Sequence, residues 1–515
     1  EHSAGPKVAV STSSSFHLAL TDPLSARMLS AKEPLLAQLG KAVQPPAPQP
    51  PPRQRDGEWR CQLRAALTLF ASTISGGLVA LPAVYQQSAI IPSIGLSLVA
   101  VGASALSLYT LALLSDRCGG ATSYGEIARR IGGWRVAAGM DLAIGFFLIG
   151  VLSGSLIVLR DWIEAVCPRY TFAATAATAS LGIFPASLPR SIGWLAHTSL
   201  LSTAAFLGML ALLCSLGAVR LSDSTLLSPD GSAAEGVWMP PAFQPRTLGT
   251  TFTVLCYAAS CQFQLLAVYA DLRERRGRLQ GAACRTEWVG EVPPTPPTKE
   301  AIDKEGGATG SQNRAHIGPA VVVAAAAMLA LSVLTGVFGV LAFAPVAIPG
   351  NVLRVLSGTP LGGLTHALCA VGVALSSPLM VHPARDCLLG AWRQAAEQGD
   401  TQLHWPRPPP AAHAALTAGI VASSLSVALL FDQVMVLISA LGSYVLCPLG
   451  IGFPGVALLY MDHLKLPSAR GCMHEAASPP VSRANRAACI FLVAVAGVTV
   501  LTSACNSALA AREGA

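Results

Sequence analysis

Runs of about 20 consecutive apolar residues recur along the whole chain, and this repetition restricts the fold more than any other feature. A helix of about that length crosses roughly 30 Å of hydrocarbon. Of the 515 residues, 52% are hydrophobic and 12% are charged, whereas soluble domains carry roughly 25% charged residues. A soluble helical protein would also need polar outer faces. The sequence therefore predicts an all-α integral membrane protein.

Apolar windows bounded by Gly, Pro and charged residues predict about eleven transmembrane helices. The predicted spans are 65–87, 90–114, 136–163, 170–186, 194–219, 248–269, 317–343, 361–389, 411–431, 434–461 and 485–510. They make up a membrane domain at 65–511, with a loop at 272–315 between helices six and seven. The preceding residues include the tract "QPPAPQPPPRQR", and a segment of that composition buries too little apolar area to fold. Residues 1–64 are thus predicted to be a disordered tail. Because the chain starts at Glu1 rather than Met, the sequence leaves open whether further residues precede it.

Basic residues gather at the ends of the predicted spans and indicate the orientation of the chain. Lys and Arg near the membrane are several times more frequent on the side of the N-terminus, where "RERRGR" at 273–278 is the largest cluster. Since such an excess marks cytoplasmic loops, the tail and the 272–315 loop are predicted to be cytoplasmic, with 221–247 opposite. The net charge of +7 therefore reflects topology, and no nucleic acid partner is predicted. The spans contact membrane lipid, and the Pro-rich tail leaves room for cytoplasmic partners.

The sequence contains no motif of a metal site, a redox site or a common enzyme class. The 13 cysteines occur singly, without the paired spacing of a zinc or redox site. There is no H-E-x-x-H, G-x-S-x-G or phosphate-binding loop. We therefore predict neither enzymatic activity nor a cofactor, apart from Na⁺ or H⁺ as a coupling ion.

The stretch "TISGGLVALP" (residues 73–82) breaks the first predicted span. Its glycine pair and its proline leave backbone N–H and C=O groups without helical partners. Hydrocarbon tolerates such groups only where they are buried in protein or line a cavity. Close helix packing through small residues is one explanation. Transporters offer another, because a half-helix N-terminus attracts an anion while unwound carbonyls receive a cation. An amino acid carries both charges on one carbon, so a broken span suits a zwitterion.

Four stretches resemble the amino acid/auxin permease family, and especially its branch of sodium-coupled neutral amino acid transporters. "TISGGLVALPAVYQQSAIIPSIGLSLVAVGASALSLYTLALLSDRCGGATSYGEIARRIGG" resembles the first two helices of the family and the following loop. "SCQFQLLAVYADLRER", "LTGVFGVLAFAPVAIPGNVLR" and "SSPLMVHPARDCLL" are similar to its helices six, seven and eight. The resemblance implies a LeuT-type core of two inverted repeats, helices one to five and six to ten, with substrate between broken helices one and six.

The resemblance implies a substrate site made of the two broken segments. Freed N–H groups around Gly76 to Val79 are expected to receive the carboxylate, since helix N-termini bind anions. The amino group is then expected near Ser260 and Cys261. The full set of predicted substrate-binding residues is Thr73, Ser75, Gly76, Gly77, Leu78, Val79, Ser260, Cys261 and Gln262. Small polar residues that only pack or bond a neighbouring backbone are the alternative interpretation.

The coupling ion is left open between sodium and a proton. Sodium-coupled relatives have an Asn where this chain has Ala71, whose side chain has no oxygen. Ser376 and Ser377 supply hydroxyls in helix eight, and His382 is of a residue type that titrates in the physiological range. The predicted function is ion-coupled symport of neutral amino acids by alternating access. A sensor that binds substrate and signals through its tail is the alternative, and the plasma membrane and the vacuolar or lysosomal membrane both remain open.

Overall fold

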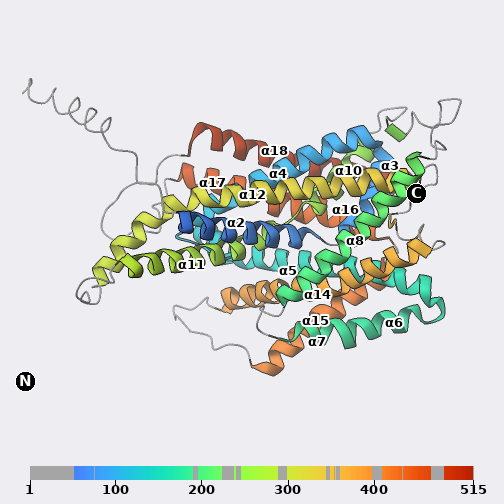
Figure 1. Cartoon of the computed structure of the whole chain (residues 1–515), viewed down its shortest axis with the longest axis horizontal. Coiled ribbons are helices and arrows are strands. Elements are labelled where there is room, and N and C mark those ends of the chain that lie inside the picture. Colours follow the sequence, from blue (N-terminus) through green and yellow to red (C-terminus); the bar gives the residue numbers. More distant parts are fainter. Residues whose placement is uncertain are drawn as a thin grey trace, which may run out of the picture. The chain divides into compact units, whose positions relative to one another are not determined.

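The computed structural model describes a helical chain. It describes residues 52–74, 76–189, 195–222, 237–238, 245–287, 299–343, 348, 350–352, 354, 360–396, 409–431, 433–464 and 481–513. All regular structure in these residues is helical (Figure 1). The predicted tail up to residue 51, Ser75 and most of 221–247 lie outside the described residues. Residues from Gly57 onward belong to one unit, and the fold is described for that unit.

The first half of the chain contributes five predicted spans. Helix one consists of α2 (Pro52–Thr73), the 3₁₀ turn η1 (Gly76–Ala80) and α3 (Leu81–Ser88). It is followed by α4 (Ile90–Arg117), α5 (Tyr124–Val166), η2 (Pro168–Tyr170), α6 (Thr171–Ala177), the π turn η3 (Thr178–Ile183), α7 (Phe184–Ser187) and α8 (Leu195–Ser222).

The second half begins with an interrupted helix. Helix six consists of α10 (Pro245–Ala258) and α11 (Gln262–Glu287). Then follow α12 (Lys299–Phe343), α14 (Pro360–Ala396), α15 (Pro410–Leu430), α16 (Val434–Leu441), the π segment η5 (Gly442–Gly452), α17 (Phe453–His463) and α18 (Arg483–Glu513).

The number of candidate membrane spans is close to the predicted number of about eleven. Within the described residues, nine spans are long and apolar enough to cross a membrane, and helix one, bent by 58°, makes a tenth. The predicted span at 170–186 is present as a continuous series of short helical pieces from Pro168 to Ser187, because a π turn interrupts it. The all-helical membrane fold is therefore confirmed.

Several predicted boundaries differ from the structure. Helix α5 begins at Tyr124 rather than at residue 136, and α12 begins at Lys299 rather than at residue 317. Helix α2 begins at Pro52 rather than at residue 65, and α11 continues to Glu287, well into the predicted 272–315 loop. A hydropathy window detects only the apolar part of a helix, whereas Arg, Glu, Leu and Gln favour helix in a polar segment as well. An ion pair between Asp271 and Arg275, 2.8 Å apart and one turn away in sequence, supports this extension.

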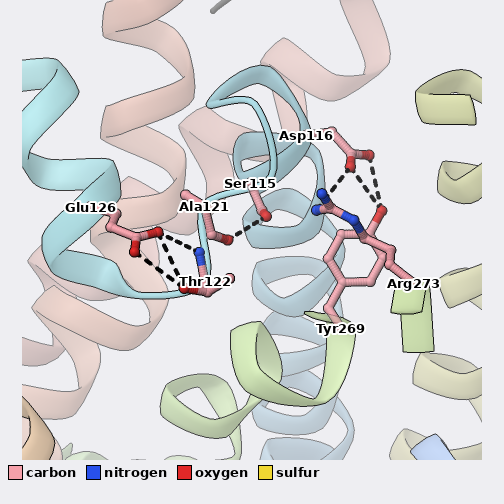
Figure 2. Close-up of polar contacts among 7 residues, drawn as sticks. All are labelled: Ser115, Asp116, Ala121, Thr122, Glu126, Tyr269 and Arg273. Atoms are coloured by element: carbon pink, nitrogen blue, oxygen red, sulfur yellow. Dashed lines mark hydrogen bonds and ion pairs between the residues drawn. The ribbon is translucent and has the colours of Figure 1, made fainter. Parts of the chain in front are cut away.

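The loop between α4 and α5 caps the start of α5, and the end of α4 contacts helix six. Ser123 caps α5 by accepting a hydrogen bond from the Glu126 N–H at 3.2 Å, and the Glu126 carboxylate accepts from the Thr122 N–H at 2.7 Å. Such reciprocal bonds fix a helix N-terminus. At the end of α4, the buried Asp116 accepts hydrogen bonds from the Tyr269 hydroxyl at 3.0 Å and lies 3.9 Å from Arg273 (Figure 2).

Candidate substrate site

The break in helix one lies directly against the end of α10. Helix α2 stops at Thr73, and η1 resumes at Gly76 with a new direction. A Cβ atom added to Gly77 would be 2.8 Å from Tyr257 Cδ1 and 3.7 Å from Ala258 Cα. Glycine is therefore required at position 77, because any side chain would hold η1 away from helix six.

Helix six is interrupted at Ala259, Ser260 and Cys261. The Ala259 carbonyl accepts a hydrogen bond from the Ser104 hydroxyl of α4 at 2.8 Å. Gln262, which is fully buried, donates from its side-chain amide to the same hydroxyl at 2.9 Å. Ser104 thus gives the Ala259 carbonyl a hydrogen-bond partner at the interruption and also holds the Gln262 side chain.

A carbonyl of η1 also has a hydrogen-bond partner outside helix one. Val79 O accepts a hydrogen bond from Val352 N at 3.1 Å, although the two residues lie on distant parts of the chain. In the same region, Gln86 of α3 accepts from Ile348 N at 2.6 Å. We call the described residues 348, 350–352 and 354, which follow α12, the closing segment.

The closing segment is also anchored to α5. The Asp161 carboxylate accepts a hydrogen bond from the Asn351 side-chain amide at 2.7 Å and forms an ion pair with Arg354 at 2.6 Å. The Asp161 side chain is 2% exposed and that of Arg354 is 42% exposed. The segment is therefore bonded to helix one and to α5 together, and it covers one side of the break.

An aromatic cluster surrounds the junction of the two breaks. The ring of Phe147 in α5 lies 6.1 Å from that of Tyr257 and 4.9 Å from that of Phe263, measured between centroids. Tyr124 contacts Phe263 at 5.4 Å and Phe453 at 5.9 Å. Such tilted pairs are favourable and restrict ring motion. The sequence carries no signal for this cluster, because its members lie on four separate elements and share no spacing.

A cavity of about 460 Å³ opens between α2, α11 and α14. Each helix contributes one face, at intervals of three or four residues. The lining residues are Cys61, Arg64, Ala65, Thr68, Ser72, Gln264, Ala267, Val268, Asp271, Leu272, Arg275, Leu379, Met380, His382, Pro383 and Asp386. Ser72 and Gln264 lie within two residues of the predicted Thr73 and Gln262, so the cavity reaches the level of the breaks.

The predicted substrate residues gather at the junction rather than in this cavity. Thr73, Gly76, Gly77, Leu78 and Val79 form the break of helix one. Ser260 and Cys261 lie in the break of helix six, Gln262 is the first residue of α11, and Ser75 lies outside the described residues.

The predicted ion-coupling residues lie on α14. His382 is 3% exposed and lines the cavity. Ser376 and Ser377 lie about one helical turn beyond Met380, and both hydroxyls donate to the Val373 carbonyl, at 3.1 and 2.7 Å. Their oxygen lone pairs therefore remain the groups that a cation would contact. Among the described residues, no three His, Cys, Asp or Glu side chains are grouped to hold a metal ion.

A multi-pass helical membrane protein with two interrupted helices packed at their breaks, and a cavity beside them, has the architecture of a membrane transporter. The sequence matches the family described as "Transmembrane amino acid transporter protein" over residues 61–280 and 311–502. The chain belongs to this family, and it is a transporter rather than an enzyme.

Comparisons with individual proteins add little to the family assignment. No curated protein sequence matches the chain. Among solved structures, the chain is similar to Mhp1, a nucleobase-cation-symport-1 family transporter in a closed conformation with bromovinylhydantoin bound. The two are 12% identical, the match covers 87% of this chain and 93% of that one, and the TM-score is 0.45. A likeness this distant does not bear on the substrate of this chain.

Proposed function

We propose that this protein is a secondary carrier of neutral amino acids that works by alternating access. The contact of Gly77 with Tyr257 and Ala258 carries this proposal, because it brings two interrupted helices together at one point. N–H groups of η1 would receive the substrate carboxylate, and carbonyls near Ser260 would receive its ammonium group.

The composition of the breaks supports a neutral substrate. Residues 73–79 and 259–262 contain no Asp, Glu, Lys or Arg. Backbone dipoles can bind the two charges that all α-amino acids share, but they offer no full charge for a charged side chain. The aromatic cluster of Phe147, Tyr257 and Phe263 adds apolar surface next to the junction.

The two sides of the junction differ in a way that fits alternating access. The closing segment covers the side of Val79 and α3, where a cavity of about 210 Å³ lies, whereas the larger cavity of about 460 Å³ lies on the side of α2 and α11. The basic clusters of the sequence predict that the side of the larger cavity faces the cytoplasm. This arrangement corresponds to a state that is closed on the non-cytoplasmic side. Substrate binding would change the population of this state.

We further propose that transport is driven by an ion gradient. Ser376 and Ser377 are the candidates for a sodium site, and His382 is the candidate for a proton site. The absence of a side-chain oxygen at Ala71 favours the proton.

Uptake into proteoliposomes tests the function. The purified protein should accumulate at least one radiolabelled neutral amino acid against its gradient when sodium or protons are supplied on one side. Binding of the amino acid without flux would instead indicate a sensor. Absence of both binding and flux for all neutral amino acids would refute the proposal.

The position of the substrate is tested by Gly77→Val. This change should weaken or abolish substrate binding in purified, monodisperse protein. Gly372→Val is the matched control. A Cβ atom at Gly372 on α14 would also lie 2.9 Å from an aromatic ring, that of Phe206 on α8. If both variants lower the folded yield and the Gly77→Val protein still binds normally, the glycine serves only packing.

A further inference from the structure

The cavity of about 210 Å³ lies between the closing segment and the start of α16, and we call it the smaller cavity. Its walls come from the end of α3, from α5, from the closing segment and from α16. A Cβ atom added to Gly350 would be 2.8 Å from Met435 Cβ, so the closing segment packs directly against α16 beside the cavity. Four elements that are distant in sequence therefore meet around one small space.

Three polar side chains that line the smaller cavity are open to solvent. The side chain of Arg354 is 42% exposed. Gln87 at the end of α3 and Gln433 at the start of α16 are exposed as well. A ligand that enters from solvent can therefore reach a guanidinium group and two side-chain amides.

The charge that such a ligand meets is positive. Only two charged side chains of the described structure line the smaller cavity, and they form the ion pair of Arg354 with Asp161. The Asp161 side chain is 2% exposed, so the carboxylate is behind the wall while the guanidinium group stands in front of it. A guanidinium group has five N–H donors in a planar fork that matches a carboxylate. The exposed part of this pair thus favours a carboxylate ligand.

We propose that the smaller cavity is a binding site for α-amino acids, separate from the junction of the two breaks. Arg354 donates to the carboxylate, and the side-chain oxygen of Gln87 accepts from the ammonium group. Small-molecule sites commonly measure about 300–1,000 Å³, so a cavity of about 210 Å³ admits a single amino acid rather than a peptide. This inference rests on the proposed function, since an amino acid is assumed as the ligand.

An amino acid in this site competes for the contact that anchors the closing segment. Arg354 Nη2 donates to Asp161 at 2.6 Å, and the carboxylate of the ligand is a second acceptor for the same guanidinium group. The closing segment is also the part of the chain that bonds to Val79 at the break of helix one, through Val352 N. A ligand in the smaller cavity therefore loosens the segment that separates it from the junction.

Protection of a cysteine tests the site. Gln433→Cys places an exposed thiol at the wall of the cavity. In purified protein whose other maleimide-reactive cysteines, the exposed Cys167 among them, are replaced by serine, a maleimide should modify this position. L-Alanine, L-leucine and L-glutamine are the protecting probes. L-Alaninamide lacks the carboxylate and N-acetyl-L-alanine lacks the ammonium group, so neither should protect at concentrations where L-alanine protects fully.

Two variants break the same ion pair but should change binding differently. Arg354→Gln removes the group that binds the carboxylate and should raise the half-protecting concentration by about tenfold or more. Asp161→Asn removes the competing carboxylate and leaves Arg354 in place, so the half-protecting concentration should stay equal or fall. If the ion pair served only to hold the closing segment, both variants would change protection in the same way, which would overturn the inference.

A second arginine controls for the loss of charge. Arg169 is exposed in η2, is predicted to lie on the same side of the membrane, and does not line the smaller cavity. Arg169→Gln should keep the half-protecting concentration within about twofold of wild type. An equal effect of Arg169→Gln and Arg354→Gln would indicate general attraction by surface charge and overturn the site. If Arg354→Gln does not fold, Gln87→Leu, which removes the acceptor for the ammonium group, provides the same comparison.

The outcomes separate this inference from the proposed function. Protection that persists in the Gly77→Val variant supports a separate site, whereas protection that disappears with it would overturn the inference. Transport of a probe amino acid without protection of Gln433→Cys would overturn it and leave the carrier function in place. Protection without transport would support the site and refute the carrier function, and absence of both would refute both. Equal protection by N-acetyl-L-alanine would show a general carboxylate site and overturn the assignment to α-amino acids.

Discussion

Replacement of Asp161 by alanine should open the side of the transporter that the closing segment covers. The buried carboxylate accepts from Asn351 at 2.7 Å and pairs with Arg354 at 2.6 Å. Hydrogen bonds to charged groups contribute roughly 1.5–3 kcal/mol each. Because Arg354 is 42% exposed, water screens its pair, and we expect a combined loss of about 1–3 kcal/mol from the closed state. This corresponds to a shift of roughly 5- to 150-fold in the equilibrium toward opening.

The reactivity of a cysteine at position 434 measures this shift. Val434 is 1% exposed and lines a cavity of about 210 Å³ that it shares with the closing segment. With Asp161→Ala, an impermeant maleimide should label Val434→Cys about tenfold faster or more, provided that opening precedes labelling. The hydrogen bond between Val79 and Val352 remains in this variant, so opening is favoured but not complete.

A second ion pair supplies the control for the Asp161 variant. Arg486 and Asp462 are 2.7 Å apart and join α18 to α17, away from both breaks. Arg486→Ala should leave the labelling of Val434→Cys unchanged. An unchanged labelling rate in folded Asp161→Ala protein, or an equal increase in Arg486→Ala, would show that the Asp161 contacts do not hold the segment closed.

Three further results are expected. Replacing sodium by choline at constant pH should leave uptake intact, because Ala71 offers no side-chain oxygen to a cation, and loss of uptake would contradict this. Tyr269→Phe should lower the free energy of unfolding by about 1–3 kcal/mol, since it removes the hydroxyl that bonds both oxygens of buried Asp116, and an unchanged thermal unfolding midpoint would argue against that contact. In sealed cells, an impermeant reagent should label Gly231→Cys, which lies outside the described residues, but not Arg285→Cys, and the reverse would invert the predicted topology.

The sequence alone was sufficient for the membrane class, most span positions and the break in helix one. Hydropathy depends on each residue and its near neighbours, so the span predicted at 317–343 coincides with the apolar part of α12, the candidate membrane span Ile317–Phe343. The break in helix one is equally local, because Gly76, Gly77 and Pro82 weaken the helix by their own backbone properties.

Only the tertiary structure decided which polar groups form hydrogen bonds with one another. Helix six is interrupted at Ala259 to Cys261 without a glycine or proline there, and the hydrogen-bond partner of the Ala259 carbonyl, Ser104, is 155 residues away from Ala259. The 2.8 Å contact of Arg385 with His382 likewise depends on packing, because the Ser187 carbonyl and the Thr417 hydroxyl hold Arg385 from other helices. Hydropathy and spacing cannot reveal such contacts, because a buried polar group is satisfied by whichever element the fold packs against it.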